Sequence, residues 1–124
     1  MTDRARTRNE LLNWLGDTVT LTGEQMDHLI DASLDIDQRY PDEDEQLERD
    51  AALSAALQYL LGETTPDIAR ETLVSARAAE RRAYVAALQM AVMAHRLGGV
   101  DKAPAARAAG IDRMRLLRAL GERE

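Results

Sequence analysis

Residues 101–121 read DKAPAARAAGIDRMRLLRALG, two short segments of helical apolar spacing with a glycine between them. Asp101 is a residue type that caps the start of a helix, and Gly110 readily adopts the positive φ of a sharp turn. Two helices that pack closely need small side chains where they cross. Three alanines fill that role, namely Ala105, Ala106 and Ala109. The stretch therefore predicts two helices joined by a tight turn, a helix-turn-helix.

The second of these helices begins near Asp112 and mixes apolar with basic residues. The apolar anchors that hold it to the rest of the protein are Ile111, Leu116 and Leu120. The remaining positions point outward and include Arg113, Arg115, Leu117 and Arg118. Near the helix start, Arg113 and Arg115 can reach base edges or phosphates in a DNA groove, whereas Arg118 is placed for backbone contact. An outward Leu117 would instead indicate a contact with another protein.

Earlier parts of the chain also show helical spacing, with apolar residues three and four apart and few β-branched residues. Helices are expected at residues 7–16, 22–40, 42–62 and 65–97. The predicted fold class is all-α, a helical bundle with a long central helix and a C-terminal helix-turn-helix. We expect capping boxes at Thr22 with Gln25 and at Asp42 with Glu45. Residues expected to face the core are Trp14, Leu47, Ala51, Leu57, Leu61 and the three tyrosines.

The long helix at residues 65–97 carries an apolar stripe that continues along most of its length. Its positions alternate spacings of three and four, interrupted only by Glu80. Between residues 84 and 94 the helix is apolar almost all round, so it must be covered on several sides. We predict a homodimer through this stripe; the alternative is burial within one chain. The dimerisation residues are Leu73, Ala83, Ala87, Met90, Ala94 and Leu97.

Charge divides the chain near its middle. Residues 1–62 hold 5 basic and 14 acidic side chains, a net charge of −9, whereas residues 63–124 hold 11 basic and 8 acidic ones, a net charge of +3. We expect three regions within one integrated domain: an acidic helical region at 1–62, a core and dimerisation helix at 63–100, and the helix-turn-helix at 101–124. Carboxylates repel phosphates, so the acidic half is expected to stay off DNA and to offer a surface for a protein partner.

Little in the sequence favours catalysis, and we predict a protein that is not an enzyme, with no cofactor and no metal site. There is no cysteine, and the only histidines are His28 and His95. Asp27, Asp31 and Asp35 lie on one helical ridge, which could bind Mg²⁺ but is better interpreted as a solvated face. The charged start MTDRARTRNELL is followed by no apolar run, so we expect a cytoplasmic protein with no membrane segment.

The last fifth of the chain resembles a known family. GGVDKAPAARAAGIDRMRLLRALGE is similar to the C-terminal helix-turn-helix of the factor for inversion stimulation (Fis), which also ends bacterial enhancer-binding activators. Lys102, Gly110, Arg113 and Leu116 are in register with the family pattern. The resemblance implies DNA binding as a dimer, with Arg113 contacting the groove or the backbone. Asp112 departs from the pattern, because the family usually has Asn there.

These patterns predict a small bacterial DNA-binding protein or transcription regulator, with duplex DNA as its partner. The residues expected to contact DNA are Lys102, Arg113, Arg115 and Arg118. One alternative is a helical protein–protein adaptor that does not bind DNA. A further alternative is a phage or plasmid subunit that recognises DNA.

Overall fold

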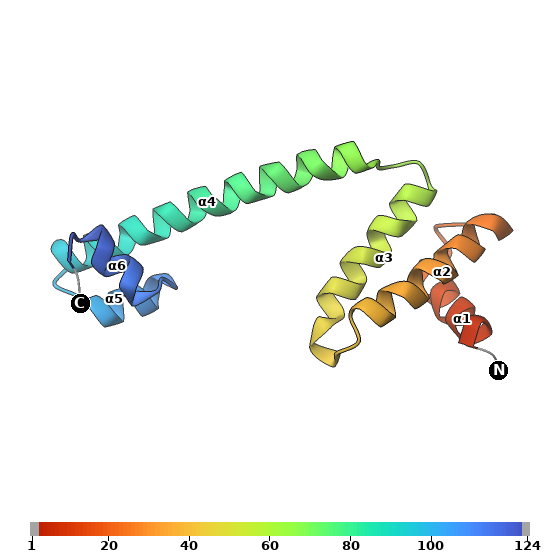
Figure 1. Ribbon diagram of the computed structural model, residues 1–124, viewed down its shortest axis with the longest axis horizontal. Coiled ribbons are helices and arrows are strands. Elements are labelled where there is room, and N and C mark those ends of the chain that lie inside the picture. Colours follow the sequence, from red (N-terminus) through yellow and green to blue (C-terminus); the bar gives the residue numbers. More distant parts are fainter. Residues whose placement is uncertain (1–2, 123–124) are drawn as a thin grey trace. The chain divides into compact units, whose positions relative to one another are not determined.

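The computed structural model describes residues 3–122. Residues 1–2 of the predicted acidic region (1–62) and residues 123–124 of the predicted helix-turn-helix (101–124) lie outside this range. All regular structure within residues 3–122 is helical, which confirms the predicted all-α class (Figure 1). The chain divides between Ala69 and Arg70 into two compact units, called unit 1 and unit 2 below. The division falls seven residues after Gly62, the position near which the sequence changes from acidic to basic.

Unit 1 contains three α-helices and one short 3₁₀ turn. The elements are α1 (Asp3–Leu15), α2 (Gly23–Arg39), η1 (Glu43–Glu45) and α3 (Gln46–Leu60). Both predicted capping boxes are present. At the start of α2, the Gln25 backbone N–H donates to Thr22 Oγ1 at 3.1 Å, and the Thr22 N–H donates to Gln25 Oε1 at 2.9 Å. The first helix begins four residues earlier than predicted, with Asp3 near its positive N-terminal end.

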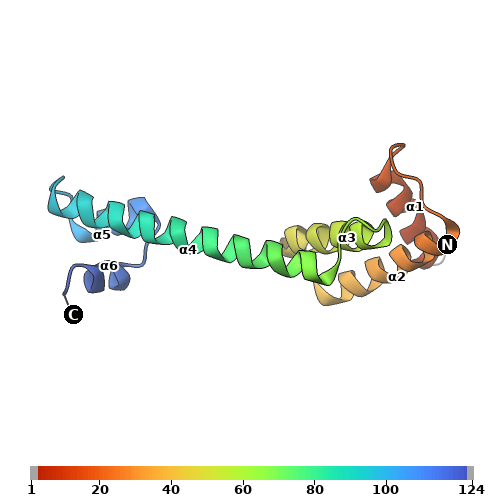
Figure 2. The same cartoon turned by 90° about the horizontal axis from the view of Figure 1, so that it is seen from above.

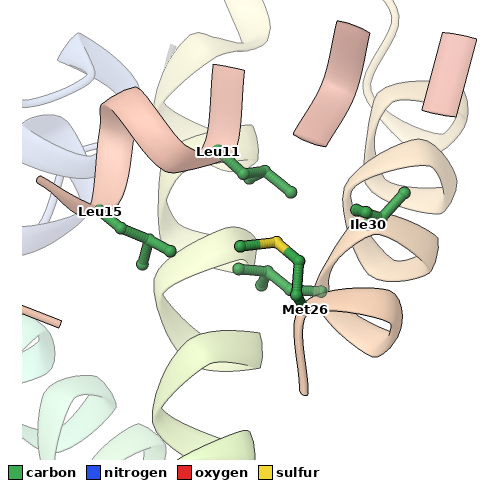
Figure 3. Close-up of a cluster of buried hydrophobic side chains, with 5 residues drawn as sticks. Leu11, Leu15, Met26 and Ile30 are labelled. Carbon is green, nitrogen blue, oxygen red and sulfur yellow. The ribbon is translucent and has the colours of Figure 1, made fainter. Parts of the chain in front are cut away.

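The core of unit 1 lies where α1 and α2 meet and is closed by α3. Figure 3 shows Leu11, Leu15, Met26 and Ile30 directed toward one another, and Leu29 belongs to the same buried cluster. Half-buried side chains of α3 that pack against it are Leu53, Ala56, Leu57 and Leu60. This apolar stripe explains how a helix with no fully buried residue still completes the core.

Several residues predicted for the core of unit 1 are exposed instead. Leu47 is 78% exposed and Ala51 is also exposed, because both lie roughly opposite the stripe that faces the core at 100° per residue. Trp14 and Tyr59 are 42% and 62% exposed. On α1 the buried positions repeat every four residues, at Thr7, Leu11 and Leu15, which leaves Trp14 on the flank. Those predictions were wrong about which side of each helix meets its neighbours.

Unit 2 consists of most of α4 (Pro66–Arg96), together with α5 (Lys102–Ala109) and α6 (Arg113–Ala119). The α4 helix starts as predicted, with Thr65 Oγ1 accepting a hydrogen bond from the Ile68 N–H at 3.2 Å. Gly110 has φ +70° and turns the chain between α5 and α6. Figures 1 and 2 agree that α5 and α6 both lie beside the C-terminal part of α4. Within the described residues of unit 2, neither α5 nor α6 lies beside the N-terminal part of α4.

The core of unit 2 is small and alanine-rich. Buried side chains from all three helices meet in it: Ala91, Val92, Ala105, Ala106 and Leu116. Ala109 and Leu120 pack against this cluster as half-buried neighbours, so the predicted crossing residues and anchors are in place. Leu117 is only 5% exposed, which corrects the prediction that it faces outward. The short α6 needs a wide apolar face to stay attached, and Leu117 widens the face formed by Leu116.

Candidate functional site

The predicted DNA-contacting arginines lie on the exposed side of α6. Arg113, Arg115 and Arg118 are all exposed, while Leu116 between them is fully buried. Asp112 caps the helix, its carboxylate accepting a hydrogen bond from the Met114 N–H at 3.3 Å. Local structure therefore follows directly from the residue order: a capping Asp, buried leucines that fix the helix, and arginines on the remaining surface.

Lys102 has a different environment from these arginines. Its ammonium group lies 2.5 Å from a carboxylate oxygen of Glu122, and its side chain is only 33% exposed. The pair connects the start of α5 to the residues after α6. Any phosphate that approaches Lys102 competes with Glu122, a partner that residue spacing alone did not predict.

Arg115 is directed toward α4. Its guanidinium carbon lies 5.7 Å from the centroid of the Tyr84 ring, the geometry of a cation–π contact. Beside this contact is an open hollow of about 580 Å³. The residues that line it are Arg77, Glu80, Arg81, Tyr84, Val85 and Arg115. The structure thus groups Arg115 with two arginines of α4 that the sequence reasoning did not select.

A signal for this grouping does exist in the sequence. Arg77, Arg81, Tyr84 and Leu88 follow one another at spacings of four, three and four, so they lie on one side of α4. Leu88 packs against the core of unit 2. The row therefore passes from the buried contact with α5 and α6 to basic side chains in the exposed part of the helix.

The predicted dimerisation stripe is largely uncovered within the described chain. Leu73, Met90 and Leu97 are 47%, 60% and 76% exposed. Ala83 is exposed, while Ala87 is half-buried. Ala94 is also half-buried, and it packs against the core of unit 2. Large apolar side chains thus remain in contact with solvent along most of α4.

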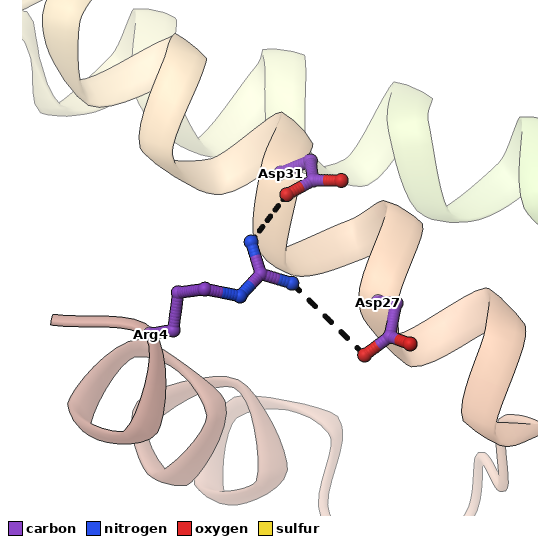
Figure 4. A network of polar contacts seen from close by, with 3 residues as sticks. All are labelled: Arg4, Asp27 and Asp31. Carbon is purple, nitrogen blue, oxygen red and sulfur yellow. Dashed lines mark hydrogen bonds and ion pairs between the residues drawn. The ribbon is translucent and has the colours of Figure 1, made fainter. Parts of the chain in front are cut away.

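The acidic ridge of α2 is engaged by arginines of unit 1. Figure 4 shows Arg4 of α1 between Asp31, to which it donates a hydrogen bond, and Asp27, 4.0 Å away. One turn further along, Arg39 donates to Asp35 at 2.7 Å. Within residues 3–122 no group of three or more Asp, Glu, His or Cys side chains could hold a metal ion. The ridge therefore serves as an ion-pairing surface within unit 1.

His95 stabilises the end of α4. Its Nδ1 lies 2.8 Å from the carbonyl oxygen of Val100, and because a carbonyl only accepts, this nitrogen donates. The contact holds the glycine-containing turn that leads into α5.

Comparison of the chain with protein-family models, with curated proteins and with solved structures found no match. Among the described residues, no helix has both the length and the apolar character needed to cross a membrane.

Proposed function

We propose that this chain is a small bacterial DNA-binding protein that regulates transcription through its C-terminal pair of helices. The observation that carries the proposal is the arrangement of α6, whose leucines are buried while Arg113, Arg115 and Arg118 are exposed. A short helix held rigidly on a core, with basic side chains outward, matches what a recognition helix needs in a major groove. The positive charge of residues 63–124 supports the same assignment.

A homodimer is the second part of the proposal. Exposed Leu73, Met90 and Leu97 give α4 an apolar face that a second copy of α4 can cover. Two-fold symmetry would then present two copies of α6 to two half-sites of duplex DNA. The acidic unit 1 remains available for a protein partner, since its carboxylates repel phosphates.

The adaptor alternative is weakened at one point. An outward Leu117 would have indicated a contact with another protein, and Leu117 is buried in unit 2. Basic side chains dominate the exposed surface of α6 instead, and these favour a polyanion over an apolar partner helix.

Salt-dependent binding of the purified protein to duplex DNA tests the proposal. We expect the logarithm of the association constant to fall linearly with the logarithm of the salt concentration. Arg113→Ala should relax discrimination between sites by about 1–3 kcal/mol, the typical value of a base contact, while Arg118→Ala should weaken all sites alike. The absence of salt-sensitive binding, or a folded triple alanine variant at positions 113, 115 and 118 that binds as the parent does, would overturn it.

A further inference from the structure

The side of α4 that carries α5 and α6 continues beyond them as a basic surface. On this side, Leu88 and Val92 pack against α5 and α6. Tyr84 is half-buried at the edge of the packed part. Toward the N-terminus the same side presents Arg81 and then Arg77, both exposed. Figures 1 and 2 show α5 and α6 beside the C-terminal part of α4.

Arg115 brings a third guanidinium group to this surface from α6. Its contact with the Tyr84 ring holds the guanidinium group beside the hollow. The Arg115 side chain is therefore already partly ordered, which lowers the entropy cost of binding a ligand. Within residues 3–122, the side chains of Arg77 and Arg81 make no ion pair or hydrogen bond. The hollow thus has three arginines and one acid, Glu80, and an excess of positive charge.

Given the DNA binding proposed above, on which this inference rests, we propose that the hollow lined by Arg77, Arg81 and Arg115 binds a phosphate group of the DNA backbone. Guanidinium groups donate paired hydrogen bonds that match the oxygens of a phosphate. The contact extends the DNA interface from α6 onto α4. It also gives Arg115 a backbone-contacting role, which leaves base reading to Arg113.

This phosphate site borders the proposed dimer interface, because Glu80 lines the hollow and also interrupts the apolar stripe. At 100° per residue, the row Arg77, Arg81 and Leu88 lies roughly 100° around α4 from the stripe that includes Met90 and Leu97. A second copy can therefore cover the C-terminal part of the stripe, at Met90 and Leu97, while the hollow stays open to DNA.

The full-length chain offers a matched pair of variants for the test. Arg81 and Arg82 are adjacent and both exposed, but only Arg81 lines the hollow. The salt slope is the slope of the logarithm of the association constant against the logarithm of the salt concentration. We expect Arg81→Gln to reduce the magnitude of this slope by about 0.9, and to reduce the affinity for duplex DNA by about eightfold at 0.1 M salt. Arg82→Gln should change affinity by less than about twofold, and Arg77→Gln with Arg81→Gln should reduce it by up to about sixtyfold.

Two further variants separate a phosphate contact from a structural role. Glu80→Gln removes the acid from the hollow and should raise both the affinity and the salt slope, opposite in sign to the arginine variants. Replacement of Arg77 and Arg81 by Lys keeps the charge and should retain most of the slope. Circular dichroism is the check that each variant remains helical.

The outcomes distinguish this inference from the proposed function. If the parent binds DNA with a salt-dependent affinity but Arg81→Gln keeps the parent's slope, the hollow is not a DNA contact and the function of α6 stands. If the parent shows no such binding, both fail together. A change of oligomeric mass in Arg81→Gln would assign the hollow to a second copy instead. Tight binding of inorganic phosphate with an unchanged DNA slope would assign it to a free anion.

Discussion

Units 1 and 2 differ in how their arginines are paired. In unit 1, Arg4 and Arg39 pair with aspartates of α2, and Arg6 pairs with Asp3 at 3.0 Å. In unit 2, Arg77 and Arg81 are exposed and make no such pair within residues 3–122. Three of the five arginines of unit 1 thus form ion pairs, whereas unit 2 leaves Arg77 and Arg81 for a partner. Binding of a polyanion is therefore a property expected of unit 2.

The cores of the two units also differ in how much of each unit they cover. In unit 1, α1, α2 and α3 all contribute to one cluster around Leu29. In unit 2 the cluster around Leu116 occupies one end of a 31-residue helix. An isolated helical stretch is only marginally stable in water without tertiary contacts. The core of unit 1 is closed by three helices of one chain, whereas we expect the exposed apolar face of α4 in unit 2 to be covered by another molecule.

The largest expected effect comes from truncating the two fully buried leucines. Leu29 and Leu116 are each 0% exposed, so Leu29→Ala and Leu116→Ala should each cost about 2–5 kcal/mol in unfolding free energy. Because the leucines belong to separate cores, each variant should destabilise mainly its own unit. Amide hydrogen exchange resolves this, with protection lost in α1–α3 for the first variant and in α5–α6 for the second. Equal loss throughout the chain would show that the units unfold as one.

The next effect concerns the apolar face of α4. Met90→Glu places a carboxylate in the proposed dimer interface, where burying an unpaired charge costs about 3 kcal/mol or more, equivalent to a rise of about 100-fold in the dissociation constant. Val74 is 58% exposed but lies on the side of α4 away from Met90, so Val74→Glu is the control. Light scattering at micromolar concentration should give a dimer for the parent and the control, and a monomer for Met90→Glu. A monomeric parent would contradict the dimer.

Sequence reasoning predicted local structure better than the direction in which helices face. Thr22 with Gln25, Thr65 before Pro66, and Gly110 act through their nearest neighbours in the chain, so residue type alone indicates their roles. Leu47 and Leu117 were assigned to the wrong environment, because the orientation of an apolar stripe depends on where neighbouring helices pack. Periodicity shows that a stripe exists, but several adjoining stripes fit an alanine-rich helix equally well.

The same limit applies to the candidate site. Arg113, Arg115 and Arg118 were selected because they follow a turn, and the structure exposes all of them. The contact of Arg115 with Tyr84 joins positions 31 residues apart, which no local pattern reveals. The ion pair of Lys102 with Glu122 is non-local as well.

A more moderate effect is expected when the acidic unit is removed. Residues 1–62 carry a net charge of −9, which repels DNA over distances of about one Debye length, roughly 10 Å at 0.1 M salt. A chain of residues 63–124 should bind non-specific duplex DNA about tenfold more tightly at low salt, provided that circular dichroism shows it to be folded. The gain should vanish toward 1 M salt. Weaker binding by the folded fragment would instead place unit 1 in the DNA interface.

The smallest effect concerns Lys102, and it distinguishes a lysine that contacts DNA from one that only forms a structural ion pair. Lys102 is held by Glu122 at 2.5 Å, and an ion pair this near the surface contributes only about 0–1 kcal/mol to folding. Glu122→Gln should therefore leave the melting temperature almost unchanged. If Lys102 contacts phosphate, the variant should bind DNA about twofold to fivefold more tightly, because Lys102 no longer has to give up the Glu122 carboxylate in order to bind a phosphate. Lys102→Gln combined with Glu122→Gln is the control and should abolish the gain. A gain that persists in the double variant would come from the loss of a negative charge near DNA, and Lys102 would then be a residue that joins α5 to the end of the chain.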